Sequence, residues 1–305
     1  MSYPKPFLKW VGGKTKLLDA LIPLFPKEIN NYHEIFLGGG SVLLAVLYAF
    51  KIKKSIMIKE KIYAYDINKE LIYVYKNVQS NPSELLEILN RIINEYNQCP
   101  VLEKKGKIKI NPQSLEEGRF SKEHYYYWCR LQYNSLQDKT SLLGSVYFIF
   151  LNKTCFRGVF RVGPRGFNVP YGNYENPEIV NREHINEIHN LIQGVEFIHS
   201  KFEASIQNIG ENDFAYLDPP YLPININSFV GYTEDGFSGE QHETLFKLCH
   251  EMKRNNKKFV MSNTDVPLIR NSFEKEFKIE SIDCRRAIHS KKPNSTTKEV
   301  IILSF

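Results

Sequence analysis

The chain has 305 residues, of which 42% are hydrophobic and 24% charged, with a net charge of +6, so it can bury one large core or two smaller ones. Its five cysteines form no C-x-x-C pair, which argues against a zinc cage or a disulfide framework, and no apolar run reaches the roughly 18 residues of a membrane helix. We therefore expect a soluble, intracellular protein without a metal or a membrane span, whose mildly basic charge suits a polyanionic partner without proving one.

The first third of the chain alternates helix and strand. Residues 14–24 predict a short helix, and residues 32–37 a strand that ends in three glycines. An almost wholly apolar helix at 41–50 and a strand at 62–65 follow, with Asp66 at the carboxyl end of that strand. This order predicts a parallel βαβ unit, whose ligands bind at the carboxyl ends of the strands.

The middle of the chain departs from this rhythm. Residues 81–84 resemble a helix start, and apolar residues follow at helical spacing. Residues 100–120 are polar and lysine-rich, as in a loop, whereas 125–136 and 142–151 predict two more helices. Residues 156–168 are rich in glycine, arginine and aromatic residues without a regular period, which indicates a loop or an irregular hairpin.

The α/β rhythm returns after about residue 182. We predict strands at 196–198, 214–217, 258–261 and 299–303, and a helix at 241–253. The simplest architecture is one α/β domain in two sequence pieces, interrupted by a mostly helical insertion.

The sequence Asp218-Pro219-Pro220-Tyr221 directly follows the strand predicted at 214–217. The prolines fix φ and lack an N–H, which gives a rigid turn whose carbonyls are free to accept hydrogen bonds. The amino group of adenine is a poor nucleophile because its lone pair is delocalised, and the Asp218 carboxylate with the Pro219 carbonyl can bind its two hydrogens. Tyr221 would then stack on the base. The alternative is a rigid turn with a capping aspartate, which four residues alone do not exclude.

Residues 36–41 read Phe-Leu-Gly-Gly-Gly-Ser between the first strand and its helix. Glycines let a ligand approach the backbone, and the helix N-terminus can receive a carboxylate or a phosphate. The pattern is not G-x-G-x-x-G, because Leu43 stands where the last glycine is required. Asp66 can bind ribose hydroxyls at the end of the next strand, although a helix cap explains it equally well.

Residues 9–15 read Lys-Trp-Val-Gly-Gly-Lys-Thr. A phosphate-binding loop is excluded, because Leu8 stands where G-x-x-x-x-G-K-[ST] needs a glycine. Lys14 can instead neutralise a ligand carboxylate, and Trp10 can offer its face to an adenine or a sulfonium. The alternative is an ordinary helix start with a core tryptophan.

Six short motifs occur in one order along nearly the whole chain: K-W-x-G-G-K (9–14), F-x-G-G-G-S (36–41), Y-D-I-N (65–68), F-N-V-P-Y-G (167–172), D-P-P-Y (218–221) and S-N (262–263). In this order the sequence resembles the Dam-like, alpha-group adenine-N6-specific DNA methyltransferases. The resemblance implies an α/β, Rossmann-like S-adenosylmethionine-dependent methyltransferase fold with an inserted, mostly helical target-recognition domain. It places the catalytic domain at 1–80 and 182–305 and the recognition domain at 81–181.

The resemblance also implies roles for individual residues. S-adenosylmethionine would be contacted by Trp10, Lys14, Phe36, Gly38, Gly40, Ser41, Asp66, Phe202 and Asp218. The flipped adenine would be held by Asp218, Pro219, Pro220 and Tyr221. Ile35 replaces the proline in the E-P-F turn usual in the family, which we expect to affect rigidity more than chemistry.

An enzyme that acts on a base of double-stranded DNA must flip that base out of the helix. Arg157, Arg161 and Arg165 lie four residues apart, and arginines on a flexible loop can read guanine edges in the major groove. The resemblance aligns Arg161 with a residue that reads guanine and Phe156 with an aromatic wedge, and we add Asn168 to the expected DNA contacts. For Arg157 and Arg165, contact with phosphates alone remains an alternative.

The local match departs from the usual G-E-F-N-V-P-F, because Gly166 is followed directly by Phe167. GATC, typical of Dam-like relatives, is therefore only one candidate target. Phosphate contacts are also expected from a C-terminal set of basic residues, Arg285, Arg286, Lys291, Lys292 and Lys298.

Three alternatives remain at this stage: methylation of cytosine or RNA, a NAD-linked oxidoreductase, and a catalytically silent DNA-binding relative. The second leaves the Asp-Pro-Pro-Tyr turn unexplained, and no expected catalytic position is replaced as the third would require. A monomer is the default state, with a dimer left open.

Overall fold

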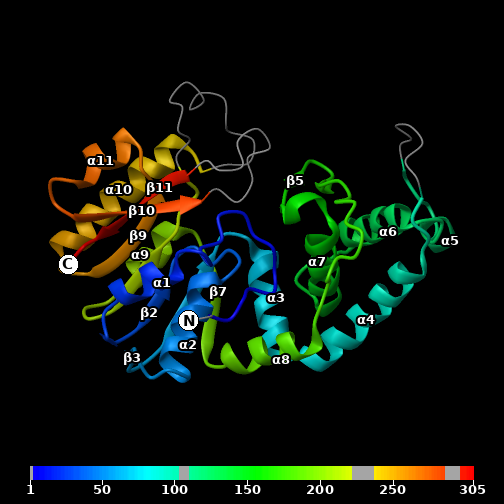
Figure 1. Ribbon diagram of the computed structural model, residues 1–305, viewed down its shortest axis with the longest axis horizontal. Coiled ribbons are helices and arrows are strands. Elements are labelled where there is room, and N and C mark those ends of the chain that lie inside the picture. The colour runs from blue at the N-terminus through cyan, green and yellow to red at the C-terminus, as the bar shows by residue number, and fades with distance from the viewer. Residues whose placement is uncertain (1–2, 103–109, 222–236, 286–295) are drawn as a thin grey trace. The chain divides into compact units, whose positions relative to one another are not determined.

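The computed structural model describes residues 3–102, 110–221, 237–285 and 296–305. The chain divides into two compact units (Figure 1). The first unit comprises Met1–Lys5, Lys14–Ile67 and Gly194–Phe305, and the second comprises Pro6–Gly13 and Asn68–Gln193. The second unit thus takes in more of the chain than the insertion expected at 81–181.

A seven-stranded sheet in the order β10-β11-β9-β8-β2-β4-β7 forms the centre of the first unit, within the described residues. Its strands are β2 (Tyr32–Glu34), β4 (Ile62–Asp66), β7 (Val195–His199), β8 (Phe214–Leu217), β9 (Lys258–Thr264), β10 (Lys278–Arg285) and β11 (Thr296–Leu303). Neighbours among β2, β4, β7, β8 and β9 are parallel, and β11 is antiparallel to both β9 and β10. The parallel strands therefore place their carboxyl ends at one edge of the sheet.

Helices cover this sheet. They are α1 (Leu18–Leu21), the short 3-10 helix η1 (Ile22–Leu24), α2 (Ser41–Lys51), α9 (Phe202–Gln207), α10 (Gly239–Arg254) and α11 (Pro267–Phe273). Side chains alternate along β8: Ala215 and Leu217 join a buried cluster with α9, α10 and α11, whereas the rings of Phe214 and Tyr216 lie against Phe25. A separate two-stranded sheet pairs β1 (Glu28–Ile29) with β3 (Met57–Ile58).

The second unit is mostly helical. Its helices are α3 (Lys69–Ser80), α4 (Pro82–Gln98), α5 (Leu115–Gly118), α6 (Lys122–Ser135), α7 (Leu142–Thr154), the short 3-10 helix η2 (Phe156–Gly158) and α8 (Arg182–Leu191). Asn68, Ser121, Ser141 and Asn181 cap helix N-termini by accepting a backbone N–H. A short antiparallel hairpin joins β5 (Val162–Gly163) to β6 (Gly166–Phe167), as expected for an irregular segment.

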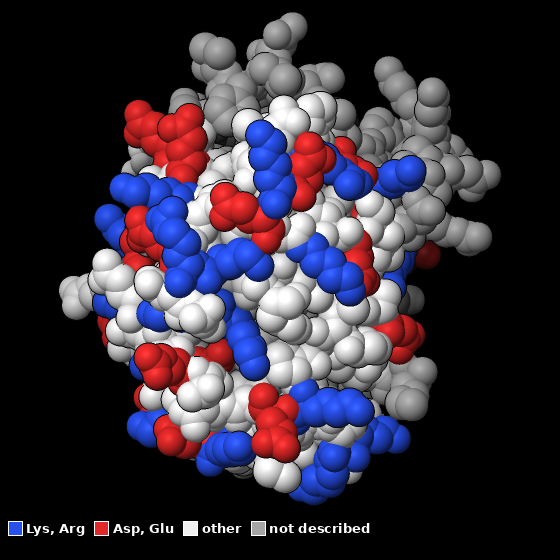
Figure 2. All heavy atoms as spheres, turned by 90° about the vertical axis from the view of Figure 1, so that its left-hand side faces the viewer, with Lys and Arg blue, Asp and Glu red and all other residues white. Residues whose placement is uncertain are grey.

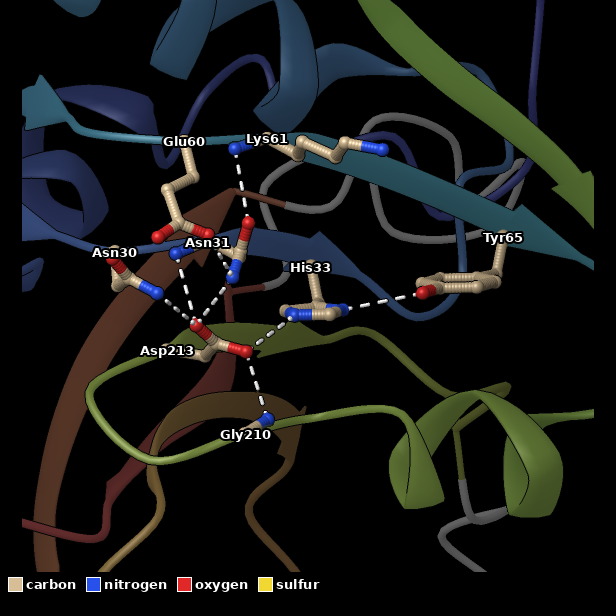
Figure 3. A network of polar contacts seen from close by, with 8 residues as sticks. All are labelled: Asn30, Asn31, His33, Glu60, Lys61, Tyr65, Gly210 and Asp213. Carbon is tan, nitrogen blue, oxygen red and sulfur yellow. Dashed lines mark hydrogen bonds and ion pairs between the residues drawn. The ribbon is translucent and has the colours of Figure 1, made fainter.

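A buried carboxylate, Asp213, ties together the amino ends of the parallel strands (Figure 3). Its Oδ1 accepts hydrogen bonds from the backbone and side-chain nitrogens of Asn31, at 3.0 and 2.9 Å. Its Oδ2 accepts the Gly210 N–H at 2.7 Å and lies 3.1 Å from Nε2 of His33, whose Nδ1 lies 3.2 Å from the Tyr65 hydroxyl. Burial raises the pKa of Asp213, but the hydrogen bonds outweigh it and leave that pKa below its usual value.

Candidate active site

The turn that follows β8 lies at the carboxyl edge of the sheet. The strand is buried along its length, and Asp218 emerges from it with 19% of its side chain exposed. The Lys14 ammonium lies 2.8 Å from Oδ1 of Asp218, and the hydroxyl of Ser262, on β9, donates to the same oxygen at 2.9 Å. The Tyr216 hydroxyl lies 2.8 Å from Oγ of Ser262. The carboxylate is thus held in one orientation by Lys14 and Ser262, and Tyr216 in turn contacts Ser262.

Burial and the Lys14 charge shift the pKa of Asp218 in opposite directions. Burial raises the pKa of the Asp218 carboxyl, and the nearby Lys14 ammonium partly counteracts it. Because Lys14 is only 3% exposed, water screens this ion pair weakly. The site therefore presents an oriented acceptor that holds a proton more readily than an ordinary aspartate.

Tyr221 is the last residue of the turn. Its ring centroid lies 4.5 Å from the Lys14 ammonium, a cation–π distance, and its hydroxyl donates to Oε2 of Glu299 on β11 at 2.5 Å. Pro219 is buried and Pro220 is exposed. All these residues belong to the first unit.

The glycine turn after β2 adopts the backbone that only glycine tolerates well. Gly38 and Gly40 have φ of 49° and 71°, and Gly40 is the N-cap of α2. The Gly38 N–H donates to Oδ2 of Asp66 at 2.9 Å, and the Lys14 N–H donates to Oγ of Ser41 at 3.0 Å. The turn thus places Asp66, Lys14 and the start of α2 around one loop.

An aromatic cluster lies beside this turn. The rings of Phe36 and Phe202 stack at 5.8 Å, and Phe237 contacts both, at 5.9 and 5.2 Å. His242, on α10, packs edge-on against Phe237, and burial lowers its pKa to about 4. The cluster is therefore uncharged at neutral pH, which suits a flat heteroaromatic ring.

Trp10 lies in the second unit, whereas Lys14 lies in the first. The Trp10 indole stacks on Phe160 with an interplanar angle of 19° and a centroid distance of 6.4 Å. Phe160 in turn stacks on Phe148 of α7 at 4.8 Å. Trp10 is half-buried, so packing accounts for part of its surface and part remains accessible.

The arginine-bearing segment carries its side chains on the surface of the second unit. Arg157, Arg161 and Arg165 are exposed, and so is Phe156, whose ring lies 5.0 Å from the Arg157 guanidinium. Across the β5–β6 hairpin, Nε of Arg161 donates to Oδ1 of Asn168 at 2.7 Å, and the Asn168 N–H donates to the Arg161 carbonyl at 3.1 Å. The structure therefore brings Arg161 and Asn168 together.

The C-terminal basic residues are only partly described. Arg286, Lys291 and Lys292 lie outside the described residues, as does the side chain of Arg285, whereas Lys298 is exposed on β11. The face drawn in Figure 2 carries lysine, arginine, aspartate and glutamate side chains interspersed. Among the described residues, this face presents no continuous basic surface for a DNA backbone.

Residues 10–288 match the family model for D12 class N6 adenine-specific DNA methyltransferases. The chain belongs to this family. Among similar curated proteins, the type II methyltransferase M.MjaIII of Methanocaldococcus jannaschii is 32% identical over 312 residues, covering 99% of both chains. The type II methyltransferase M1.LlaDCHI of Lactococcus lactis subsp. cremoris is 29% identical, covering 99% of this chain and 95% of its own. The DNA adenine methylase of Escherichia coli K12 is 26% identical, covering 95% and 91%.

The D12 class methyltransferase reaction takes its methyl group from S-adenosylmethionine, and the residues of the first unit fit this donor. The Asp66 carboxylate at the end of β4 suits ribose hydroxyls, and the positive-φ turn at Gly38 and Gly40 leaves room beside the backbone. The partly exposed Phe36 ring, stacked on the buried Phe202 ring, offers an apolar surface for adenine. Within the described part of the chain, no three His, Cys, Asp or Glu side chains gather as metal ligands, and none of the helices is long and apolar enough to cross a bilayer.

Two residues of the site were not singled out from the sequence. Glu34, at the end of β2, is buried; its Oε2 accepts from the Tyr32 hydroxyl at 2.5 Å and its Oε1 from the Leu43 N–H at 3.1 Å. Burial raises the pKa of Glu34 to about 8. The second residue is Glu299, whose only signal is a lone acid at the start of an apolar run.

Proposed function

We propose that the chain transfers a methyl group from S-adenosylmethionine to the 6-amino group of a flipped adenine in double-stranded DNA. The observation that carries this proposal is the rigid turn after β8, where Lys14 and Ser262 orient the Asp218 carboxylate at the carboxyl edge of the sheet. The proposal includes a Rossmann-like methyltransferase domain at 1–80 and 182–305 and a target-recognition domain at 81–181. It also places the enzyme inside the cell, as a monomer.

The chemistry proposed for the turn follows from its acceptors. The Asp218 carboxylate and the Pro219 carbonyl accept one N–H each from the amino group, which draws its nitrogen towards tetrahedral geometry and frees its lone pair. Pro220 keeps the turn rigid, and Tyr221 stacks on the base. The donor would supply its methyl from a sulfonium, whose S–C bond breaks as the N–C bond forms and leaves a neutral thioether. One proton must leave the amino nitrogen as the new N–C bond forms, and we assign its acceptance to Asp218, whose pKa is raised by burial.

Donor binding is assigned to the loop around α2 and its neighbours. Asp66 holds the ribose, Phe36 and Phe202 pack on the adenine, and Lys14 neutralises the carboxylate. Gly38, Gly40 and Ser41 form the wall at the start of α2, and Trp10 offers its accessible surface to the donor. This assignment is supported by the hydrogen bonds from the Gly38 and Lys14 N–H groups, which already place these residues around one turn.

Target recognition is assigned to the exposed arginine segment of the second unit. Arg161 reads a guanine edge, with Asn168 fixing its guanidinium, and Phe156 acts as a wedge beside the flipped base. Arg157 and Arg165 contact the backbone or further bases. GATC, or a related short site, is the proposed target.

The test is a methyl-transfer assay with labelled S-adenosylmethionine and duplex DNA, followed by digestion and identification of the methylated nucleoside. We expect N6-methyladenine, and we expect Asp218→Asn to reduce the rate by roughly 100-fold or more, because the amide offers the base one acceptor but no charge. Glu274→Gln, an exposed change on the same unit, is the control and should leave the rate unchanged. Label in cytosine or in RNA, or full activity of the Asp218 variant, would overturn the proposal.

A further inference from the structure

The Tyr221 ring is held at its far end by a residue from a distant strand. Its hydroxyl donates to Oε2 of Glu299 at 2.5 Å. Glu299 lies on β11, where its backbone pairs with Thr264 of β9 on one side and Ile282 of β10 on the other. Tyr221 itself belongs to no helix or strand, so the sheet gives its side chain an anchor that its own backbone lacks.

This contact suits a charged acceptor and a neutral donor. Burial raises the pKa of Tyr221 well above its usual value, and the Asp218 and Glu299 carboxylates raise it further. The hydroxyl therefore keeps its proton and donates to Glu299 rather than accepting. Hydrogen bonds to a carboxylate are shorter and stronger than neutral ones. Because the hydroxyl oxygen lies on the axis of the second side-chain torsion, this bond restricts the first torsion and so fixes where the Tyr221 ring lies.

The fixed ring also touches the rest of the site. Lys14 lies 4.5 Å from the ring centroid and 2.8 Å from Oδ1 of Asp218. A shift of the ring would thus disturb both the stacking surface for the base and the group beside the accepting carboxylate. Stacking on a base requires the ring face to be parallel to it, so an unanchored ring loses productive orientations.

We propose that Glu299 is a positioning residue for methyl transfer, which holds the Tyr221 ring in its place beside the flipped adenine. Glu299 touches neither the base nor the donor in this proposal and acts only through the Tyr221 hydroxyl. The inference rests on the proposed function of the turn after β8. It predicts an effect on the orientation of the bound base and on kcat, and little effect on donor binding.

The test is a double-mutant cycle of Glu299→Ala and Tyr221→Phe, because Phe keeps the ring and removes only the hydroxyl. Each variant should lower kcat roughly tenfold while the KM for S-adenosylmethionine stays within about twofold of the wild type, and the double variant should be no worse than either single one. Glu299→Gln, whose amide oxygen still accepts, should recover most of the loss. Glu280→Ala on β10, which removes a side chain that forms an ion pair with Lys278, is the matched control and should leave kcat unchanged.

Base stacking is read independently with duplex DNA that carries 2-aminopurine at the target position. The wild type should quench the flipped probe by stacking it on Tyr221, and both single variants should leave it brighter, whereas Glu280→Ala should not. Multiplicative losses in the double variant, or a Glu299→Ala variant that unfolds at lower temperature with unchanged kcat and quenching, would overturn the proposal. If that variant does not fold, Tyr221→Phe and Glu299→Gln still decide it. A wild type that makes no N6-methyladenine would instead refute the proposed function itself.

Discussion

The ammonium of Lys14 and the carboxylate of Asp218 form a nearly buried ion pair, at 2.8 Å, between the N-terminal segment and the end of β8. Each residue of the pair makes a further hydrogen bond. The backbone N–H of Lys14 donates to Oγ of Ser41, and the Ser262 hydroxyl donates to the Asp218 carboxylate. The residue assigned to the donor carboxylate is therefore also the residue that controls the charge of the base-binding carboxylate. In the proposed function, donor binding and base binding would share this one cation.

Replacing Lys14 by Met should move the acid limb of the pH–rate profile to higher pH. The carboxylate form of Asp218 is the acceptor, so activity falls as the pH drops through the pKa of this group. Lys14 lowers that pKa against the effect of burial, so its removal raises the pKa further. The measurement is kcat/KM against pH, which reports groups of the free enzyme. Lys16→Met, an exposed change two residues away, should leave the profile in place, and coincident profiles for all three proteins would contradict the prediction.

Replacing Glu34 by Gln should make stability less dependent on pH. The pKa of Glu34 is about 8 in the folded protein, against about 4.3 for an unperturbed glutamate, so the folded state binds the proton more tightly. The wild type should therefore lose free energy of unfolding as the pH rises from about 4 to 8, by on the order of a few kcal/mol at about 1.36 kcal/mol per pKa unit.

Chemical denaturation at several pH values measures this difference. Across that pH window the free energy of unfolding of the Glu34→Gln variant should rise relative to that of the wild type. Above the window the difference between the two proteins should stay constant. Glu28→Gln, an exposed change on β1, serves as the control and should follow the wild type. A difference in the free energy of unfolding between variant and wild type that is the same at every pH would show that Glu34 does not titrate in this range.

The strands of the central sheet that are buried could be predicted from the sequence, because parallel strands covered on both faces read as short apolar runs. The runs at 214–217 and 258–261 are confirmed as β8 and β9. The edge strand β10 was not predicted, since Lys278–Arg285 reads K-I-E-S-I-D-C-R, and its polar residues mask the strand pattern. The helix predicted at 14–24 was wrong in length, because α1 ends at Leu21 and gives way to η1, which contains Pro23.

The parts of the candidate site that are local in sequence could be predicted, because the Asp-Pro-Pro-Tyr turn and the glycine turn carry their chemistry within a few residues. The contact of Glu299 could not, because it depends on β11 lying next to β9 and β9 next to β8, an order that the sequence does not state. The partners of Glu34 are near in sequence, but its burial depends on the packing around β2. Arg161 and Asn168 form an intermediate case, because a short hairpin brings together two residues that lie seven positions apart in the sequence.

Replacing Asp213 by Asn should destabilise the first unit without touching the turn after β8. The carboxylate accepts N–H groups from Asn31 and Gly210 and pairs with His33, and an amide would present a donor to some of them. We expect a loss of about 1–3 kcal/mol in the free energy of unfolding at neutral pH. Because the pKa of Asp213 is lowered on folding, the advantage of the wild type should be present above about pH 4 and vanish as the pH falls through the lower, folded-state value.

Urea denaturation at pH 7 and at low pH measures both parts of this prediction, with Glu211→Gln as the exposed control nearby. A variant as stable as the wild type at pH 7 would show that the network at the amino ends of the strands contributes little. Methyl transfer below the unfolding temperature should be nearly unchanged, since the network lies at the other edge of the sheet.

Replacing Arg161 and Arg165 by Ala, one at a time, should separate base reading from backbone contact. Arg161 is held by Asn168, whereas Arg165 is exposed at the tip of the same hairpin. Loss of a bidentate guanine contact costs about 1–3 kcal/mol of discrimination. Arg161→Ala should therefore lower kcat/KM roughly 10- to 100-fold on the preferred site and much less on sites altered at one base. Arg165→Ala should lower kcat/KM by the same factor on all sites. It should also reduce the slope of the logarithm of the DNA-binding constant against the logarithm of salt concentration by about one.

The preferred site is found first, by long-read sequencing of DNA methylated in cells that express the wild type, and single-base variants of that site are then compared. Asn168→Ala should resemble a weaker Arg161→Ala, because it frees the guanidinium without removing it. If both arginine variants lowered kcat/KM by the same factor on every site, the hairpin would contact only phosphates. The residues that recognise the target sequence would then have to lie elsewhere on the chain.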